Sequence, residues 1–365
     1  MSALLRGETV AWQDTWEPER ITDMIRYHGI ALALVEGDSD LSAWPASALK
    51  PVREEARLQA LWEASHREML VRVLDALAKE GIETRLLKGA AVAYLAYETP
   101  AVRRRGDSDL LVRPGREQDA ERVLRGLGLK PEGPPSFGQQ NWVFDTGMGF
   151  RHAIDLHWRL VGSPYLCSVL DEVAFWGEPV ALPRLCVTAQ TVPQELLMLR
   201  GLINQALHAT HGYYHDGERV HEGERLIWLM DLALLMRRFA PADWERLVAA
   251  ATKSGLVARC LAGMQRAAAL LDAPLPQSIA AQLAAASGPH ATEHYLTDAT
   301  LGERVRKDFV SLDRWSDRLQ LIRRHAFPDA QSLRNRYPEN AHWPLIMLYA
   351  KRMLGALSKR LTRRR

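Results

Sequence analysis

The feature that most constrains the fold is the stretch RRRGDSDLLV, residues 103–112. Three arginines lead through Gly106 to Asp107 and Asp109, and an apolar run follows at residues 110–112. Such a run predicts a buried strand, and residues two apart in a strand lie on the same face. The two carboxylates therefore point to one side, where they repel each other unless a cation lies between them. Mg²⁺ takes oxygen ligands and holds substrate phosphates at the same time, so the pair indicates a metal site.

A third carboxylate is needed to support two ions for in-line displacement at phosphorus. The segment RHAIDLHWRL, residues 151–160, alternates as a strand does, with one face made of Ile154, Leu156 and Trp158 and the other of Asp155, His157 and Arg159. Asp155 is the best candidate because it lies on the polar face. Asp145 is a weaker candidate, because it stands at a strand end beside Thr146 and Gly147.

A phosphate site is expected upstream, in LLKGAAVAYL. The pattern predicts a short strand that ends at Gly89 and a helix of small residues over 90–97. A helix N-terminus offers free N–H groups and a partial positive charge to a phosphate. Gly89 lets the backbone approach closely, and Lys88 adds charge.

The order of expected elements indicates an α+β protein with a small mixed β-sheet. A helix over 53–79 precedes the core, PEGPPSFG (131–138) is expected as a loop, and two strands follow it. From about residue 190 the pattern is helical. We therefore expect an N-terminal helical segment (1–80), an α/β core (81–162), a connector (163–190) and a helical domain with a basic tail (191–365).

Composition narrows the class of protein. A formal charge of +3 does not indicate nucleic-acid binding for the whole chain, although residues 351–365 hold seven basic side chains and no acidic one. The cysteines Cys167, Cys186 and Cys260 are few and widely spaced, as in a reducing compartment. The N-terminus has no secretory signal pattern, and the most apolar run, LIWLMDLALLM, has 11 residues and is too short to span a bilayer. We expect a cytoplasmic protein without a transmembrane segment.

These motifs, in this order, resemble the uncharacterised nucleotidyltransferase family of the DNA polymerase beta-like nucleotidyltransferase superfamily. That family has a Lys-Gly-Ala strand–helix turn, an Arg before Gly-Asp-x-Asp-Leu-Leu-Val, and an acidic residue before Leu-His-Trp. The matching positions are Lys88, Gly89 and Ala90, then Arg103, Gly106, Asp107 and Asp109, then Asp155, His157 and Trp158. Segments on both sides also look similar, so the resemblance extends over most of the chain.

The resemblance implies transfer of a nucleoside monophosphate from an NTP, such as ATP, to an acceptor hydroxyl. Asp107 and Asp109 would ligate two Mg²⁺ ions, or Mn²⁺ in their place, and Asp155 would act as a ligand or general base. Lys88, Gly89, Ala90 and Arg103 would bind the nucleotide. The sequence sets neither the acceptor nor the oligomeric state; a small metabolite, a peptide, a protein or an RNA end all fit.

Alternative interpretations stay open at this point. Ala90 supplies no hydroxyl to a phosphate. This residue would be tolerated in a non-catalytic member of the family that binds nucleotides or has a regulatory role. The basic C-terminus could dock on RNA or on an anionic membrane, since an apolar face (Ile346, Tyr349, Ala350, Met353, Leu354, Leu357) adjoins its basic residues.

Two further features allow a structural and a functional interpretation. His208, His211, His215 and His221 crowd one region with Asp216, and His211 and His215 have the spacing of a helical metal pair. Gly212 and Gly217 argue against a regular helix there, so a polar loop near the site is the favoured interpretation. Asp231, in an otherwise apolar helix, is expected to pair with an Arg or a backbone group, or else to reach the site.

Overall fold

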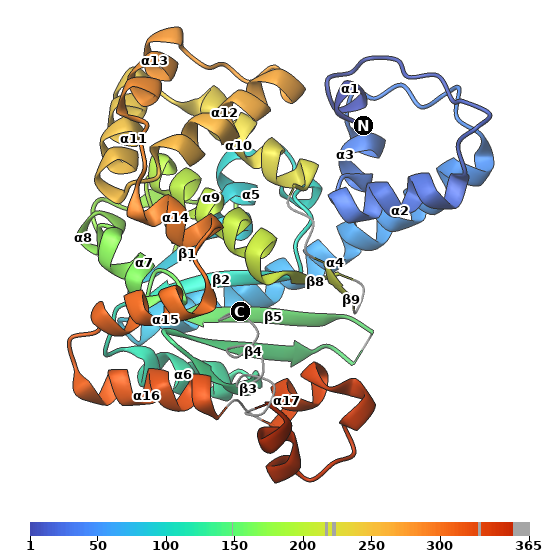
Figure 1. Ribbon diagram of the computed structural model, residues 1–365. Helices are drawn as coiled ribbons and strands as arrows, with labels where there is room; N and C mark the ends of the chain where they lie inside the picture. The colour runs from blue at the N-terminus through green and yellow to red at the C-terminus, as the bar shows by residue number, and fades with distance from the viewer. Residues whose placement is uncertain (148, 216–217, 221–223, 328–329, 353–365) are drawn as a thin grey trace, which may run out of the picture. The chain divides into compact units, whose positions relative to one another are not determined.

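The computed structural model describes the chain except for residues 148, 216–217, 221–223, 328–329 and 353–365 (Figure 1). Contacts divide the chain into two compact units, Met1–Glu303 and Arg304–Arg365. The first unit holds the mixed sheet, with helices packed on it, and the fold is α+β as the sequence predicts. No described helix is long and apolar enough to cross a membrane.

The main sheet has seven strands in the order β3-β4-β5-β2-β1-β7-β6. Strands β2 and β5 lie next to each other near its centre and are parallel. Strands β1 and β7 are also parallel, and the other neighbouring pairs are antiparallel. The strands are β1 (Thr84–Leu87), β2 (Asp107–Val112), β3 (Lys130–Ser136), β4 (Gln139–Asp145), β5 (Arg151–His157), β6 (Val180–Ala181) and β7 (Gln190–Thr191).

The two faces of the central strands meet different helices. On one face, His66 of α4 (Ala46–Lys79) shares a hydrogen bond of 2.8 Å with Ser108, and Ser65 of α4 shares one of 2.8 Å with His152. On the other face, α5 (Lys88–Ala96) packs on β1 and β2. The predicted alternation is confirmed within β5, where Ile154 and Leu156 are buried on the same face as His152, which contacts α4. The odd-numbered residues of β2 and β5 therefore face α5. Trp158 and Arg159 lie beyond the end of this strand.

A helical layer packs on α5 and completes the first unit (Figure 1). Its first two helices, α9 and α10, contact α5 directly, and a short hairpin of β8 (Tyr213–His215) and β9 (Glu218–Val220) connects them. The helices are α9 (Gln194–His211), α10 (Leu226–Arg238), α11 (Pro241–Ser254), α12 (Val257–Leu271), α13 (Gln277–Ala286) and α14 (Ala291–Thr297). Helix α6 (Glu117–Gly126) contacts α4, and α7 (Pro164–Val169) and α8 (Glu172–Phe175) lie between β5 and β6 in the chain.

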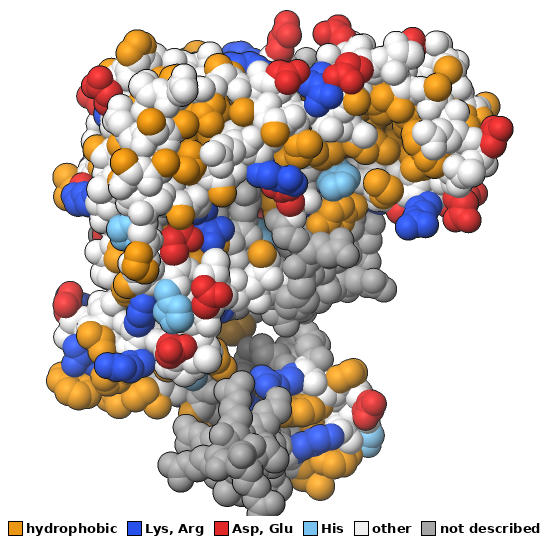
Figure 2. Space-filling view, turned by 45° about the horizontal axis from the view of Figure 1, so that its top comes forward, with side chains coloured by type: hydrophobic (Ala, Val, Ile, Leu, Met, Phe, Trp, Pro, Cys, Tyr) orange, Lys and Arg blue, Asp and Glu red, His pale blue; other side chains and the backbone are white. Residues whose placement is uncertain are grey.

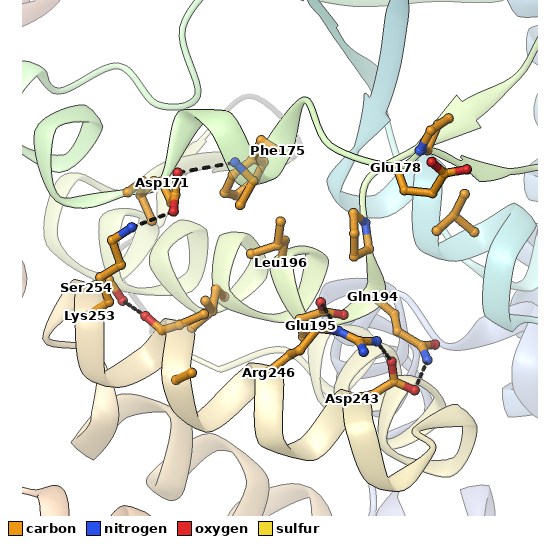
Figure 3. A pocket seen from close by; sticks show the side chains of 18 of the residues that line it. Asp171, Phe175, Glu178, Gln194, Glu195, Leu196, Asp243, Arg246, Lys253 and Ser254 are labelled. Atoms are coloured by element: carbon orange, nitrogen blue, oxygen red, sulfur yellow. Dashed lines mark hydrogen bonds and ion pairs between the residues drawn. The ribbon is translucent and has the colours of Figure 1, made fainter.

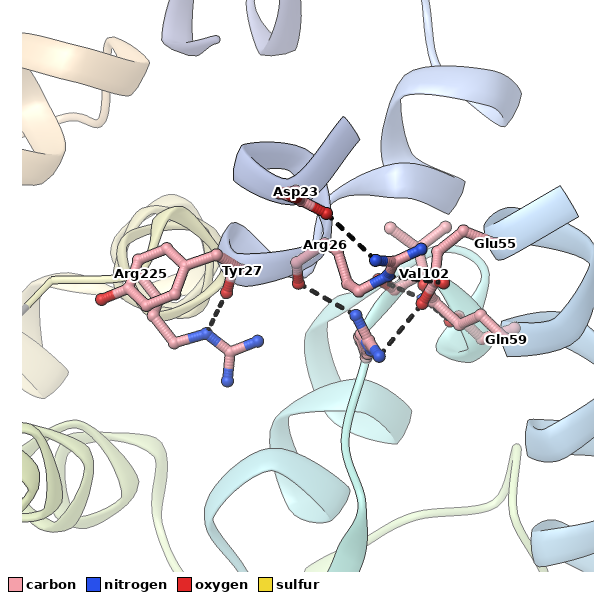
Figure 4. Close-up of polar contacts among 9 residues, drawn as sticks. Asp23, Arg26, Tyr27, Glu55, Gln59, Val102 and Arg225 are labelled. Carbon is pink, nitrogen blue, oxygen red and sulfur yellow. Dashed lines mark hydrogen bonds and ion pairs between the residues drawn. The ribbon is translucent and has the colours of Figure 1, made fainter. Parts of the chain in front are cut away.

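The N-terminal helices pack on α4 through apolar residues, and polar side chains add bonds around this contact (Figure 4). Helices α1 (Ser2–Leu5), α2 (Pro18–His28) and α3 (Ala31–Glu36) come first. Arg26 of α2 forms an ion pair of 3.2 Å with Glu55 of α4, and Gln59 of α4 donates to the carbonyl of Ala101 beside the short η1 (Pro100–Val102). The bond from Gln59 holds the segment that leads into β2.

Three element boundaries differ from the sequence predictions. The expected loop 131–138 is largely the strand β3, whose prolines are tolerated because β3 is an edge strand. Helix α4 starts at Ala46, seven residues earlier than expected, and it contains Pro51. Helix α5 starts at Lys88, directly after β1, so Gly89 lies within its first turn.

The second unit contains most of α15 (Leu301–Val310), then α16 (Trp315–Ala326), α17 (Ala330–Arg336) and η2 (Pro338–Asn340). Leu312, Leu321, Leu333 and Leu348 are its buried leucines among the described residues.

Candidate functional site

The parallel pairing of β2 and β5 brings two of the predicted carboxylates together. Asp109 and Asp155 are register partners, and Asp107 pairs with Ala153 two positions earlier. Side chains of register partners on parallel strands lie on the same face, one strand spacing apart. One ligand atom each from Asp109, Asp155 and His157 lies within 4.8 Å of the others, an arrangement that could hold a metal ion.

Asp109 is held by two neighbours. Lys88 Nζ lies 2.5 Å from Asp109 Oδ1, and His157 Nε2 donates to the same oxygen at 2.9 Å. Burial alone raises the pKa of Asp109, but the charge of Lys88 and the hydrogen bond from His157 outweigh it and lower that pKa. Burial also lowers the pKa of His157, so a neutral ring donates through Nε2. Asp109 is therefore a fixed, ionised carboxylate.

Asp107 and Asp155 differ from Asp109. Among the described residues, neither carboxylate takes part in a side-chain hydrogen bond or ion pair. Burial, followed by the charge of Asp109, raises the pKa of Asp107 to about 6 and that of Asp155 to about 7. These two carboxylates, which have no partner in the described part of the chain, lie near the ionised Asp109 and make the site rich in oxygen atoms that could hold a divalent cation.

The start of α5 lies next to this cluster. Lys88 has a φ of 49°, a left-handed conformation that is rare for a residue with a side chain. Strained backbone of this kind is common at functional sites, and here it accompanies the contact between Lys88 and Asp109. The first turn of a helix leaves N–H groups without intrahelical partners, which are those of Lys88, Gly89 and Ala90 in α5.

Gly89 is required by a close approach. A Cβ atom at this position would lie 3.0 Å from the guanidinium carbon of Arg103. Arg103 cannot easily withdraw, because Nε and Nη2 both donate to the carboxylate of Asp231 at 2.7 Å and Nη1 donates to the carbonyl of Arg104. The structure thus places Arg103 against Gly89, with its nitrogens already engaged by the protein.

The three consecutive arginines bind three different carboxylates of the protein. Arg103 pairs with Asp231 of α10, Arg104 with Glu55 of α4 at 3.0 Å, and Arg105 with Glu63 of α4 at 2.8 Å. Figure 4 shows the ion pairs around Glu55. The cationic run therefore anchors the start of β2 between α4 and α10, and so it fixes where Asp107 and Asp109 point.

The sequence reasoning missed Arg200 of α9, and it named His208 of α9 only as a member of the histidine cluster. Arg200 is 3% exposed, its Nε donates to the carbonyl of Leu160 at 2.8 Å, and its buried Nη1 has no hydrogen-bond partner in the described part of the chain. Burial lowers its pKa, and the charges of Asp109 and Asp155 act against that effect. Burial, then the charges of Lys88 and Arg200, lowers the pKa of His208 to about 4. An Arg and a His eight residues apart in an apolar helix share one face, which was the available signal.

The other sequence candidates lie outside the acid cluster. Asp145 accepts a hydrogen bond from the N–H of Gly147 at the end of β4, four residues along the strand from Asn141, the register partner of Asp155. Asp231 pairs with Arg103 and accepts from Tyr97, which confirms its expected pairing with an arginine.

The histidine cluster does not form a helical metal pair. Helix α9 ends at His211 with Gly212 as its C-cap, and His215 belongs to β8, so the two are not on one helix. The predicted interruption of the helix at Gly212 is confirmed. Asp216 and His221 lie outside the described residues.

A cavity of about 720 Å³ lies elsewhere, between α8, α9 and α11, and several of its charged residues bind one another (Figure 3). Lys253 contacts Asp171 at 2.5 Å, and Arg246 bridges Glu195 and Asp243. None of the clustered carboxylates of β2 and β5 lines it. A smaller cavity of about 30 Å³, lined by Lys88, Gly89 and Arg103, adjoins the start of α5.

Comparison with known families gives one match. The model of a family described as uncharacterised nucleotidyltransferase matches residues 14–272, which include the sheet, α5 and the helices up to α12. No curated protein matches the chain significantly.

Proposed function

The chain belongs to the uncharacterised nucleotidyltransferase family, and we propose that it transfers a nucleoside monophosphate from an NTP to an acceptor hydroxyl. The observation that carries this proposal is the pairing of Asp109 and Asp155 across β2 and β5, with Asp107 close enough for its charge to raise the pKa of Asp155. The family supports nucleotidyl transfer in general, and the carboxylates suggest how the chain carries it out.

We propose that the three carboxylates hold two divalent cations. Asp107 and Asp155 have no protein partner among the described residues, and their pKa values are raised by burial and by the negative charge nearby. A cation would relieve that repulsion. We assign Asp107, Asp109 and Asp155 as ligands of Mg²⁺, with Mn²⁺ as a substitute. When bound, the ions would neutralise charge on the phosphates and orient the reacting oxygens.

The NTP phosphates are assigned to the first turn of α5. Free N–H groups there, together with the charge of Lys88, favour an anion. Arg103 would act indirectly, because its guanidinium packs against Gly89 and adds positive charge near Asp107 while Asp231 holds it. Arg103 is therefore proposed as the residue that holds the shape of the phosphate site.

In the proposed reaction, the acceptor hydroxyl loses its proton and its oxygen bonds to the α-phosphorus. The bond from the α-phosphorus to the bridging oxygen breaks, and pyrophosphate leaves with that oxygen and its electron pair. Asp155 is the carboxylate proposed to accept the proton, because it lies opposite Asp109 across β2 and β5 and has no protein partner among the described residues. If Asp155 serves only as a ligand, the proton passes to water.

The test compares ATP labelled in its α-phosphate with ATP labelled in its γ-phosphate, in a cell lysate with added protein and Mg²⁺. Nucleotidyl transfer predicts that the α label enters an acceptor, that the γ label does not, and that Asp155→Asn removes the signal. Incorporation of the γ label instead would indicate phosphoryl transfer. Transfer of the α label that persists in Asp155→Asn would also contradict the proposal.

A further inference from the structure

The second unit differs from the first in charge. Residues 304–365 contain 16 Lys and Arg and 5 Asp and Glu, a formal charge of +11. Residues 1–303 contain 31 Lys and Arg and 39 Asp and Glu, a formal charge of −8. The small charge of the whole chain therefore hides a strongly basic unit. The match to the nucleotidyltransferase family ends at residue 272, so this unit lies outside it.

The second unit also exposes an unusual amount of apolar surface. Of the exposed large hydrophobic side chains in the described part of the chain, eight lie in the second unit and seven in the much longer first unit. Those of the second unit are Val310, Trp315, Leu319, Ile322, Phe327, Leu345, Ile346 and Met347. Exposed apolar groups that gather in this way usually mark an interaction surface.

Three of these residues lie on one face of helix α16. Trp315, Leu319 and Ile322 are spaced by four and three residues, and they are 67%, 63% and 48% exposed. Leu321 points the other way and is buried. Exposed arginines stand at both ends of the helix, namely Arg314, Arg323 and Arg324. Figure 2 shows hydrophobic and basic side chains gathered together at the lower left, over α16.

We propose that α16 is a membrane-surface helix that docks the protein on an anionic lipid bilayer. An amphipathic helix with an apolar face and a basic flank lies in the interface, where the apolar side chains enter the acyl region and the arginines meet lipid phosphates. The charge of +11 supplies the complementarity to an anionic surface.

Two other partners fit this surface less well. Nucleic acid would satisfy the arginines and could stack on Trp315, but it offers nothing to exposed aliphatic side chains such as Leu319 and Ile322. A second copy of the chain would cover the apolar face but would bring two units of +11 together, which repel each other. Acyl chains beside anionic headgroups satisfy both features.

The experiment is co-sedimentation of the full chain with vesicles of phosphatidylcholine alone or of phosphatidylcholine and phosphatidylserine. We expect binding to the anionic vesicles at about 0.15 M salt and much weaker binding at about 1 M salt or to the neutral vesicles. Leu319→Ser with Ile322→Ser should lower the affinity for anionic vesicles at least roughly tenfold, because two apolar side chains no longer enter the bilayer. Arg323→Gln with Arg324→Gln should also lower it roughly tenfold.

The matched control is Val173→Ser with Val187→Ser, which removes two exposed valines of the first unit, 82% and 97% exposed. This variant should bind vesicles as the wild type does. Equal binding to neutral vesicles, no binding to either kind, or loss of binding in the control would overturn the proposal. The proposal would also be overturned if the protein bound a labelled RNA but no vesicles, and if Leu319→Ser with Ile322→Ser left the RNA binding unchanged. Self-association that these substitutions abolish, without vesicle binding, would assign the face to a second copy.

Discussion

Replacing Asp155 by Asn should stabilise the protein in the absence of divalent cations. Asp155 is ionised at pH 8 in a site where burial and the charges of Asp109 and Asp107 raise its pKa from 3.8 to about 7. A shift of about 3 units corresponds to about 4 kcal/mol at about 1.4 kcal/mol per unit. Because the carboxylates titrate together, we expect one substitution to recover about half, roughly 2 kcal/mol. That is an increase of about 4 °C in Tm for a unit of this size.

The pH dependence has a definite sign. A carboxyl group with a raised pKa binds more protons in the folded state than in the unfolded state between the two pKa values, so stability falls as the pH rises through that window. The difference between Asp155→Asn and the wild type should therefore be small near pH 4, grow above it, and level off above about 7. Asn mimics the protonated carboxyl group throughout.

The assay is thermal melting in EDTA across this pH range and then with excess Mg²⁺ at pH 8. Mg²⁺ should raise the Tm of the wild type more than that of Asp155→Asn, because a ligand that binds only the folded state stabilises it. Asp14→Asn, at an exposed carboxylate without a hydrogen-bond or ion-pair partner among the described residues, is the control and should match the wild type. An Asp155→Asn variant that melts at or below the wild type in EDTA at pH 8 would refute the reasoning.

Three further predictions concern the same site. Asp109→Asn should instead lower the free energy of unfolding by about 2 kcal/mol in EDTA, because the charge-assisted bonds to Lys88 and His157 are lost. This variant should transfer no α label, and a Tm above that of the wild type would contradict the prediction. Gly89→Ala should weaken NTP binding about tenfold, as measured by calorimetry, because its Cβ would lie 3.0 Å from Arg103. Gly106→Ala is the control: its Cβ would meet no atom within 4 Å, so this variant should bind NTP as the wild type does. Lys88→Met should bind Mn²⁺ in the absence of NTP about tenfold more tightly, as measured by electron paramagnetic resonance, because the ammonium group 2.5 Å from Asp109 is removed. The same variant should bind NTP more weakly. An unchanged affinity for Mn²⁺ would count against the proposed metal site.

The sequence predicted the parts of the site that depend on local periodicity. The alternation of β5 and the spacing of Asp107 and Asp109 assign each side chain to a face, because successive residues of a strand point to opposite sides. The pairing of β2 with β5 in register then brings Asp155 opposite Asp109. Where the pattern was ambiguous the predictions were wrong, as in the proline-rich stretch now seen as the edge strand β3.

The charge states of the carboxylates depended on tertiary structure. From the sequence, Asp107 and Asp109 look equivalent, yet Lys88 and His157 hold Asp109 in its ionised form, whereas Asp107 has no hydrogen-bond or ion-pair partner among the residues that the structure describes. Likewise, the pairing of Arg103 with Asp231 joins residues 128 positions apart. Local sequence determines which face a side chain occupies, since that follows from the dihedral angles of its own strand. Its pKa and its partners follow from burial and from charges that distant segments bring within a few ångströms, and only the folded chain decides these.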